Sequence, residues 1–311
     1  MTPAANQTGE AEARARKAAG AAYALAAFFF WGTVPVYFKA VGHVPALEIL
    51  THRIVWSVLL LGAIIALTRR WRAIAAALSE RRTLLLLLFT TSVLSLNWLV
   101  FIWAINAGRV LETSLGYYIN PLVNVVLGVV VLRERVGPWR SLAVVLAAAG
   151  VLNLALRAEG FPWVALTLAF TFGTYGLIRK TVKIEAAEGL LVETVLLLPF
   201  GLAYLLYLAA SGAGAFGTVD WRTDLLLVLS GAVTALPLIW FTAAARRLDY
   251  STLGFFQYIA PSGHFLLAVF VYGEPFTNAH LVTFLCIWSG LAIYTLRSLA
   301  ASRRPRPVNP A

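Results

Sequence analysis

Long runs of apolar residues, separated by short polar or charged segments, make up most of this chain. A helix needs about 20 mainly apolar residues to cross a bilayer. Helices are the expected spanning elements, because a spanning segment must pair its own backbone groups and these runs are rich in Ala and Leu. No connection is long enough to hold a soluble domain. The pattern predicts ten membrane-spanning helices, at about residues 21–41, 46–67, 84–106, 110–132, 140–157, 162–179, 189–210, 224–245, 250–272 and 279–299.

The fourth and ninth predicted helices carry the same polar skeleton. In each, a small Ser/Thr-Leu-Gly motif is followed by a proline and then, thirteen residues later, by a glutamate. Weaker matches continue in the same order along both halves, which is typical of an internal duplication. We therefore expect two repeats, residues 20–157 and 158–300, with a disordered N-terminus (1–19) and a disordered basic tail (301–311). The first copy is Ser114-Leu115-Gly116, Pro121 and Glu134, and the second is Thr252-Leu253-Gly254, Pro261 and Glu274.

Five helices per repeat is an odd number, so the second repeat must enter the membrane upside down relative to the first. Inverted repeats give a protein two similar conformations, one open to each side, around a shared site near the midplane. That architecture serves transport by alternating access. A membrane enzyme or a scaffold has no comparable need for it, although the repeat alone excludes neither.

The composition excludes a soluble globular protein, because 60% of the residues are hydrophobic, only 13% are charged and the mean hydropathy is +0.80. The net charge of +11 follows from topology. With both termini in the cytoplasm, 20 of the 25 Lys and Arg residues fall on the cytoplasmic side and 4 on the other, as the positive-inside rule predicts. The expected partners are therefore the lipid bilayer and a small-molecule substrate, and no nucleic acid; a homodimer is left open. The single cysteine, Cys286, suits neither a disulfide nor a zinc site, and we predict no metal or cofactor.

Polar residues inside apolar helices are costly and are candidates for function. Asn120 and Asn124 are four residues apart and share one helix face, where a close helix–helix seam is an equally good interpretation. The duplication places His264 opposite Asn124, which favours a pair of residues lining a cavity. Pro121 and Pro261 are expected to kink both helices in mid-span.

Arg53 lies about seven residues into the second predicted helix, roughly 10 Å deep. It either extends outwards to the interface or attracts an anionic group of the substrate. Its neighbour His52 corresponds to Glu193 in the second repeat. Inversion separates Glu193 from Arg53 in depth, so we expect no direct ion pair between them. Glu193 or His264 could exchange protons, and proton coupling is a hypothesis. Three further candidates for the site are Asn97, Tyr175 and Gln257.

These residues also carry a family resemblance. Residues 48–57, 97–106 and 114–123 of the first repeat, and residues 172–180, 189–194 and 257–261 of the second, resemble the RarD permeases. That group is the EamA branch of the drug/metabolite transporter superfamily, often labelled chloramphenicol-sensitivity proteins. The resemblance implies an all-α membrane protein of ten transmembrane helices in two inverted EamA repeats, acting as a permease in the bacterial cytoplasmic membrane. It does not supply a substrate.

The sequence thus predicts a secondary transporter that moves a small organic metabolite or drug, in the outward direction. The alternative is an intramembrane enzyme that acts on a lipid-linked substrate. An enzyme should show a nucleophile with a base, or paired carboxylates within reach of each other. Here the buried titratable residues are few and separated in depth, so we predict no catalytic residues.

Overall fold

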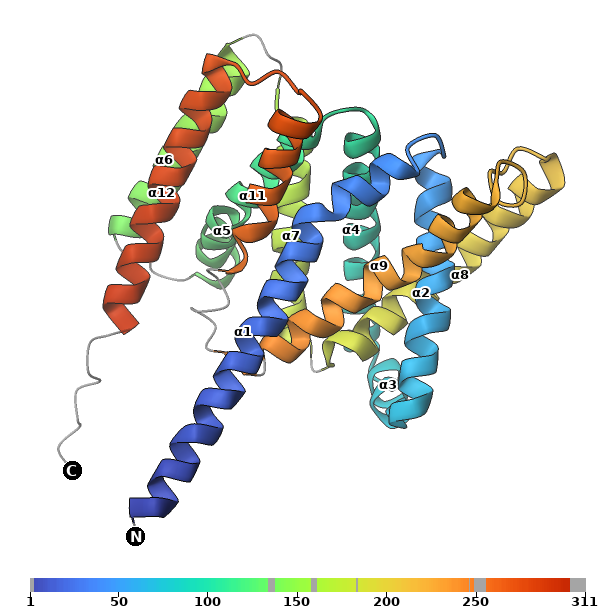
Figure 1. Cartoon of the computed structure of the whole chain (residues 1–311), viewed down its shortest axis with the longest axis horizontal. Coiled ribbons are helices and arrows are strands. Elements are labelled where there is room, and N and C mark those ends of the chain that lie inside the picture. Colours follow the sequence, from blue (N-terminus) through green and yellow to red (C-terminus); the bar gives the residue numbers. More distant parts are fainter. Residues whose placement is uncertain are drawn as a thin grey trace.

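The computed structural model describes residues 3–133, 138–157, 161–182, 184–245, 247–248 and 256–302, and in this part of the chain all regular secondary structure is helical (Figure 1). The part of the chain predicted to form the first repeat contains six helices: α1 (Pro3–Ala40), α2 (Ala46–Thr68), α3 (Trp71–Ser79), α4 (Arg81–Asn106), α5 (Val110–Leu132) and α6 (Pro138–Leu156). The part predicted to form the second repeat contains α7 (Trp163–Thr181), α8 (Ala186–Ser211), α9 (Trp221–Ala245), α11 (Ile259–Leu266), which continues as a short π-helix, η1 (Leu267–Val271), and α12 (Asn278–Ser302).

Each of the ten predicted apolar stretches overlaps at least one of these helices. Among the described residues, five helical segments are long and apolar enough to cross a membrane, and three shorter apolar helices accompany them. The chain is therefore an all-helical membrane protein. The five long segments are Ala15–Ala40, Ala46–Thr68, Arg81–Asn106, Ala187–Ser211 and Trp221–Phe241.

Two helical segments differ from the expectation. Helix α1 begins at Pro3, where disorder was expected for residues 1–19, because that segment is rich in alanine and in charged residues that favour helix. Helix α3 was not expected at all. Its nine residues are too few to be predicted as a membrane span. They form a short amphipathic helix between α2 and α4.

The two prolines for which kinks are predicted lie at different positions in their helices. Helix α5 runs without a break through Pro121. Pro261 is the third residue of α11, which starts after a turn at Gln257 and Tyr258. A proline is tolerated in the first turn of a helix, because its missing N–H would have no intrahelical partner there. The expected kink at Pro261 is thus replaced by a helix start.

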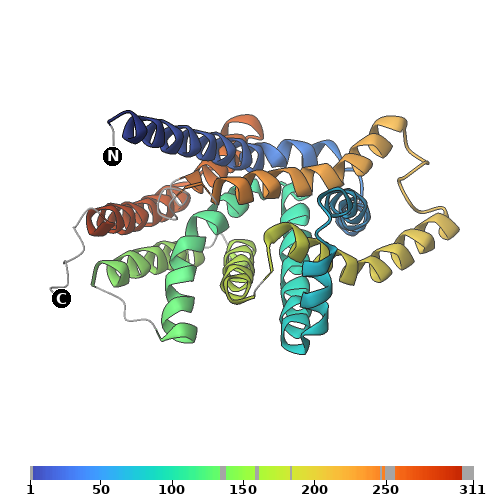
Figure 2. The same cartoon turned by 90° about the horizontal axis from the view of Figure 1, so that it is seen from below.

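The first helix of each predicted repeat packs on helices from the other half of the chain. Helix α1 lies against α9 and α11, while α7 lies against α4 and α5. Helices α6 and α12 pair at one edge of the molecule, far from α2 and α8 at the opposite edge (Figures 1 and 2). The two halves of the chain are therefore interleaved rather than placed side by side.

Small residues allow the closest helix approaches. A Cβ built on Gly263 of α11 would lie 2.7 Å from the backbone oxygen of Gly32 in α1. A Cβ on Gly116 of α5 would lie 2.8 Å from the backbone oxygen of Ala165 in α7. Such contacts are typical of membrane bundles, where van der Waals packing replaces the hydrophobic effect between helices.

We name the two ends of the bundle by their connections. The α3 end carries α3, the start of α1 and the end of α12, and the α4–α5 end carries the α1–α2, α4–α5 and η1–α12 connections (Figure 1). Both termini of the described chain thus lie towards the same end.

Candidate substrate site

Arg53 lies between helices of both repeats. Its Nε donates a hydrogen bond to Thr234 Oγ1 of α9 at 2.6 Å. Its guanidinium lies over the ring of Trp98 in α4, 4.1 Å from the centroid, and 5.9 Å from the ring centroid of Phe38 in α1. The side chain is therefore held inside the bundle by ring faces and a hydroxyl, which is a different arrangement from one extended to the interface.

No carboxylate pairs with Arg53 in the described part of the chain, whose salt bridges involve other arginines. The side chain nevertheless keeps part of its surface accessible, although three helices surround it. A buried cation without a counter-ion is costly, and such residues in membrane proteins mark ligand or ion sites.

Glu193 of α8 forms a second charged centre, and it is neutralised within the protein. Its Oε1 accepts a hydrogen bond from Thr90 Oγ1 of α4 at 2.7 Å, and its Oε2 accepts one from the Tyr175 hydroxyl of α7 at 3.2 Å. Nε of Arg179 lies 3.9 Å from Oε1. The carboxylate is 1% exposed. Arg53 and Glu193 both contact α4, but through different residues, Trp98 and Thr90, and they form no ion pair with each other.

A row of aromatic side chains links the two charged centres, and we call it the aromatic line. Its first ring lies beside Arg53 and its last ring donates to Glu193. Successive ring centroids are 5.7 to 6.3 Å apart, within the range of favourable aromatic contacts. Its five members come from α1, α4, α5 and α7: Phe38, Phe101, Tyr117, Phe172 and Tyr175.

Two of the residues predicted for the site hold helices together. Both ring nitrogens of His264 are engaged, Nε2 with the backbone oxygen of Trp31 at 2.9 Å and Nδ1 with Thr113 Oγ1 at 3.3 Å. His264 thereby joins α11 to α1 and α5. Asn97 donates from its amide to the Leu168 backbone oxygen at 3.1 Å and to the Thr171 side chain, which joins α4 to α7. Each polar group is satisfied across a helix boundary, as the bilayer requires.

The remaining predicted residues are less engaged. Nδ1 of His52 accepts a 3.3 Å hydrogen bond from the Trp56 indole, and its Nε2 is buried without a partner in the described chain. Asn120 is fully buried on the α5 face that meets α7, and neither amide atom has a hydrogen-bond partner among the described residues. Gln257 lies in the turn before α11. The side chain of Asn124 is outside the described residues, so the predicted Asn124–His264 pair is a sequence prediction only.

Glu274, the second glutamate of the duplicated motif, closes the α4–α5 end. Its two carboxylate oxygens accept hydrogen bonds from the backbone N–H groups of Val110 and Leu111, both at 2.7 Å, and so cap α5. Burial raises the pKa of Glu274, while the two backbone donors act in the opposite direction. Beside this cap, the Lys39 ammonium lies 5.3 Å from the Tyr272 ring centroid. The first glutamate of the duplicated motif, Glu134, lies outside the described residues.

Below the cap, α5 and α11 are joined by hydrogen bonds between residues of the two copies of the motif. Ser114 donates to the backbone oxygen of Pro261 at 2.8 Å, and the hydroxyls of Tyr118 and Ser262 are 2.6 Å apart. The two duplicated segments therefore lie side by side in space, and they meet near the α4–α5 end.

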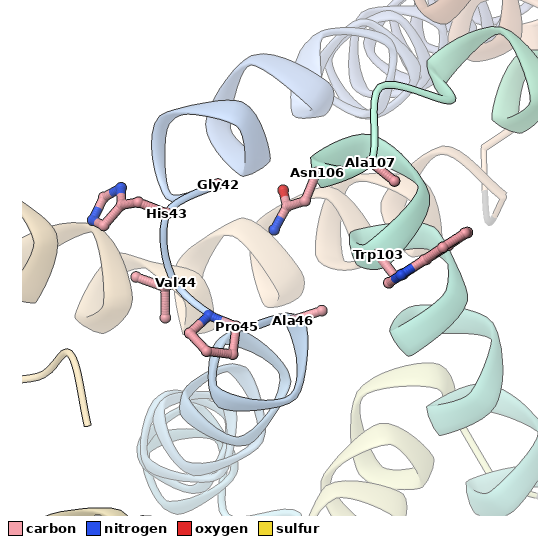
Figure 3. A pocket seen from close by; sticks show the side chains of 8 residues that line it. All are labelled: Gly42, His43, Val44, Pro45, Ala46, Trp103, Asn106 and Ala107. Carbon is pink, nitrogen blue, oxygen red and sulfur yellow. The ribbon is translucent and has the colours of Figure 1, made fainter. Parts of the chain in front are cut away.

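A pocket of about 300 Å³ lies at the α4–α5 end, between the α1–α2 turn and the last turn of α4 (Figure 3). The Asn106 side chain extends from α4 towards Gly42 of the turn, and its Oδ1 is buried without a hydrogen-bond partner in the described chain. The pocket contains none of the nine residues predicted for the site. Because the unpaired charge and the aromatic line lie elsewhere, we place the candidate site at Arg53. The full lining is Gly42, His43, Val44, Pro45, Ala46, Trp103, Asn106 and Ala107.

Some residues of the candidate site were not singled out from the sequence. Arg179 was counted among cytoplasmic charges because it ends a predicted span, but Tyr175 is four residues earlier on the same helix face and was a usable signal. Thr90 and Thr234 gave no signal, since threonines are common in such helices. Trp98 gave no signal either, because a tryptophan inside a helix of this kind most often packs between helices.

Comparison with known proteins supports the prediction that the chain is a transporter. Residues 18–156 match the model of the EamA-like transporter family. An "Uncharacterized transporter" of Vibrio cholerae is 49% identical over 287 residues, covering 92% of this chain and 95% of that protein. "Protein RarD" of Escherichia coli K12 is 45% identical over 285 residues, covering 92% and 96%.

A more distant relative, "Chloramphenicol-sensitive protein RarD" of Pseudomonas aeruginosa, is 34% identical and covers 86% of this chain and 91% of its own length. One crystal structure aligns with 91% of this chain and 99% of its own chain, with a TM-score of 0.57 and 19% identity. At this identity, the likeness supports the fold alone.

The all-helical bundle and these relatives define a multi-pass transporter of the bacterial inner membrane, and not an enzyme. Within that class, the chain belongs to the EamA-like transporter family as a RarD-type permease. Its substrate is a small molecule, and its surroundings are the lipid bilayer.

Proposed function

We propose that the chain is a secondary active transporter that exports a small organic metabolite or drug by alternating access of two inverted five-helix repeats. The observation that carries this proposal is Arg53, a cation enclosed by α1, α4 and α9 without a carboxylate partner in the described chain. A charge kept inside the membrane at such cost is best explained by a ligand that neutralises it in part of the transport cycle.

The packing of the helices supports the inverted repeat. Exchanging α1 with α7, α4 with α9 and α5 with α11 turns the α1–α9 contact into the α7–α4 contact, and the α1–α11 contact into the α7–α5 contact. Two-fold relations of this kind underlie alternating access in transporters built from inverted repeats. In the proposed topology, both termini and the α3 end are cytoplasmic and the α4–α5 end is external.

Proton coupling is the second element of the proposal. Glu193 lies inside the bundle with Arg179, Tyr175 and Thr90 around it. A carboxylate that is buried and hydrogen-bonded can exchange a proton when its surroundings rearrange. We therefore assign Glu193 as the proton-exchanging residue of the cycle.

Flux into proteoliposomes tests the function. The purified protein is reconstituted and offered amino acids, amphenicols, purines and organic acids, with and without an imposed pH gradient. We expect uptake of at least one compound, driven by the gradient and lost in Glu193→Gln. Arg53→Gln should abolish the uptake, whereas Arg72→Gln, at an exposed position of α3, should leave it unchanged. Intact liposomes that show no uptake of any compound, or equal uptake with Arg53→Gln, would contradict the proposal.

A further inference from the structure

We infer that Arg53 and the aromatic line form a binding site for an organic monocarboxylate that carries a flat ring. This inference rests on the proposed transport function and names the substrate class of that site. It is argued from the free donors of Arg53, from the rings that surround them, and from the absence of a free carboxylate along the aromatic line in the described chain.

The guanidinium of Arg53 keeps hydrogen-bond donors that a ligand can use. Its Nε is used by Thr234, and no hydrogen bond from either Nη atom occurs among the described residues. An arginine side chain with both Nη groups free presents two of its donors to a planar carboxylate in a bidentate geometry. The Thr234 bond fixes the direction of the fork, because it holds the guanidinium against the face of Trp98.

Tyr117 offers a further donor. Its hydroxyl is close enough to Arg53 for the two groups to interact electrostatically, and it forms no hydrogen bond within the described chain. The Tyr117 ring contacts Phe101, Phe172 and His264, so it points into the bundle, yet it remains partly accessible. Arg53 and Tyr117 are thus two interior side chains that each keep accessible surface.

The rings around Arg53 and Tyr117 favour a ligand with a flat apolar body. The rings of Trp98 and Phe101 are almost completely buried, and those of Tyr117 and Phe172 are partly accessible. Edge and face contacts with aromatic rings stabilise a planar ring more than a flexible chain of similar size. Since the line continues from Arg53 towards Tyr175, successive rings offer a path for the same ligand.

The charge of the ligand follows from the charges that are already matched. Glu193, at the other end of the line, has Arg179 as its counter-ion, so it offers no free charge to an amine. Arg53 is a single cation, which balances one carboxylate and leaves the second charge of a phosphate or dicarboxylate unmatched. A singly charged organic acid therefore fits this site better than a cation or a dianion.

Thermal stabilisation of the purified full-length chain in detergent tests the ligand class with matched probes. These are 3-phenylpropionate, 3-phenylpropylamine and 3-phenylpropanol, which share a ring and differ in charge, and propionate, which has the charge and lacks the ring. We expect only 3-phenylpropionate to raise the unfolding temperature. Equal stabilisation by the alcohol or the amine would overturn the inference.

Variants separate the contributions of individual residues to binding. Arg53→Gln should weaken the binding of 3-phenylpropionate at least tenfold, since it removes a charge-assisted contact. If that variant fails to fold, Tyr117→Phe keeps the ring and removes only the hydroxyl, and we expect a several-fold loss. Arg72→Gln is the matched control. Unchanged binding in both site variants would refute the site.

The same probes distinguish this inference from the proposed function. Binding of 3-phenylpropionate without any flux in proteoliposomes would support the site and count against transport. Flux of a neutral or cationic compound, with no binding of 3-phenylpropionate, would support transport and overturn the inferred ligand class.

Discussion

The crossing of α1 and α11 makes a quantitative prediction, because its two glycines tolerate a methyl group very differently. A Cβ on Gly263 would meet the backbone oxygen, Cα and carbonyl carbon of Gly32 at 2.7 to 2.9 Å. Ordinary contacts begin at 3.4 Å, so the helices would have to separate by roughly 0.7 Å. A Cβ on Gly32 would meet nothing closer than 3.3 Å. Gly263→Ala should therefore be harmful and Gly32→Ala should not.

The expected size follows from two opposing terms. Overpacking of this kind costs about 1–3 kcal/mol, whereas replacing a mid-helix glycine with alanine gains about 1 kcal/mol of helix propensity. Gly263→Ala should then lower the free energy of unfolding by about 0–2 kcal/mol. Gly32→Ala should be neutral or stabilising by up to about 1 kcal/mol.

Unfolding by SDS in mixed micelles, followed by tryptophan fluorescence, measures both variants. Gly176→Ala serves as the control, because a Cβ at this position of α7 meets no atom within 4 Å, and it should gain about 1 kcal/mol from propensity alone. The reasoning is refuted if Gly263→Ala proves as stable as Gly32→Ala while the control behaves as expected.

Three further predictions concern the hydrogen bonds and the topology. Asn97→Leu removes both bonds between α4 and α7 and should lower the free energy of unfolding by about 1 kcal/mol in the same assay. Because burial raises the pKa of Glu274 above its ordinary value of 4.5, its contribution to stability is largest at low pH; the stability of the wild type relative to Glu274→Gln should therefore fall as the pH rises from 4.5. In a Cys286→Ser background, a cysteine replacing Ser79 should react with an impermeant thiol reagent only from the cytoplasm, and one replacing Thr218 only from outside; labelling of both from one side contradicts the proposed topology.

Apolar length was enough to place the helices, because a bilayer imposes it on every spanning segment. Helix α3 was not predicted, because its nine residues are too few to span a bilayer. Proline position was less informative. In the duplicated motif, Pro121 and Pro261 occupy equivalent positions. In the structure, Pro121 lies inside α5, whereas Pro261 lies in the first turn of α11.

The candidate site was predictable as a set of polar residues and unpredictable as a set of contacts. Arg53 and Glu193 stood out because charge is rare inside these helices, and the predicted inversion led us to expect no ion pair between them. Asn97 clearly needed partners, yet one of them is the backbone oxygen of Leu168, which no side-chain pattern can reveal. Arg179 was missed because a cation at the end of a span looks like any other topogenic charge.

The packing of α1 on helices from the other half of the chain has a consequence for biogenesis. Helix α1 precedes its packing partners α9 and α11 in the sequence and therefore leaves the ribosome before them. Until they are inserted, the α1 face around Gly32 lacks the neighbours that cover it in the folded protein. We therefore expect α1 to reach its final packing only after α9 and α11 have been inserted.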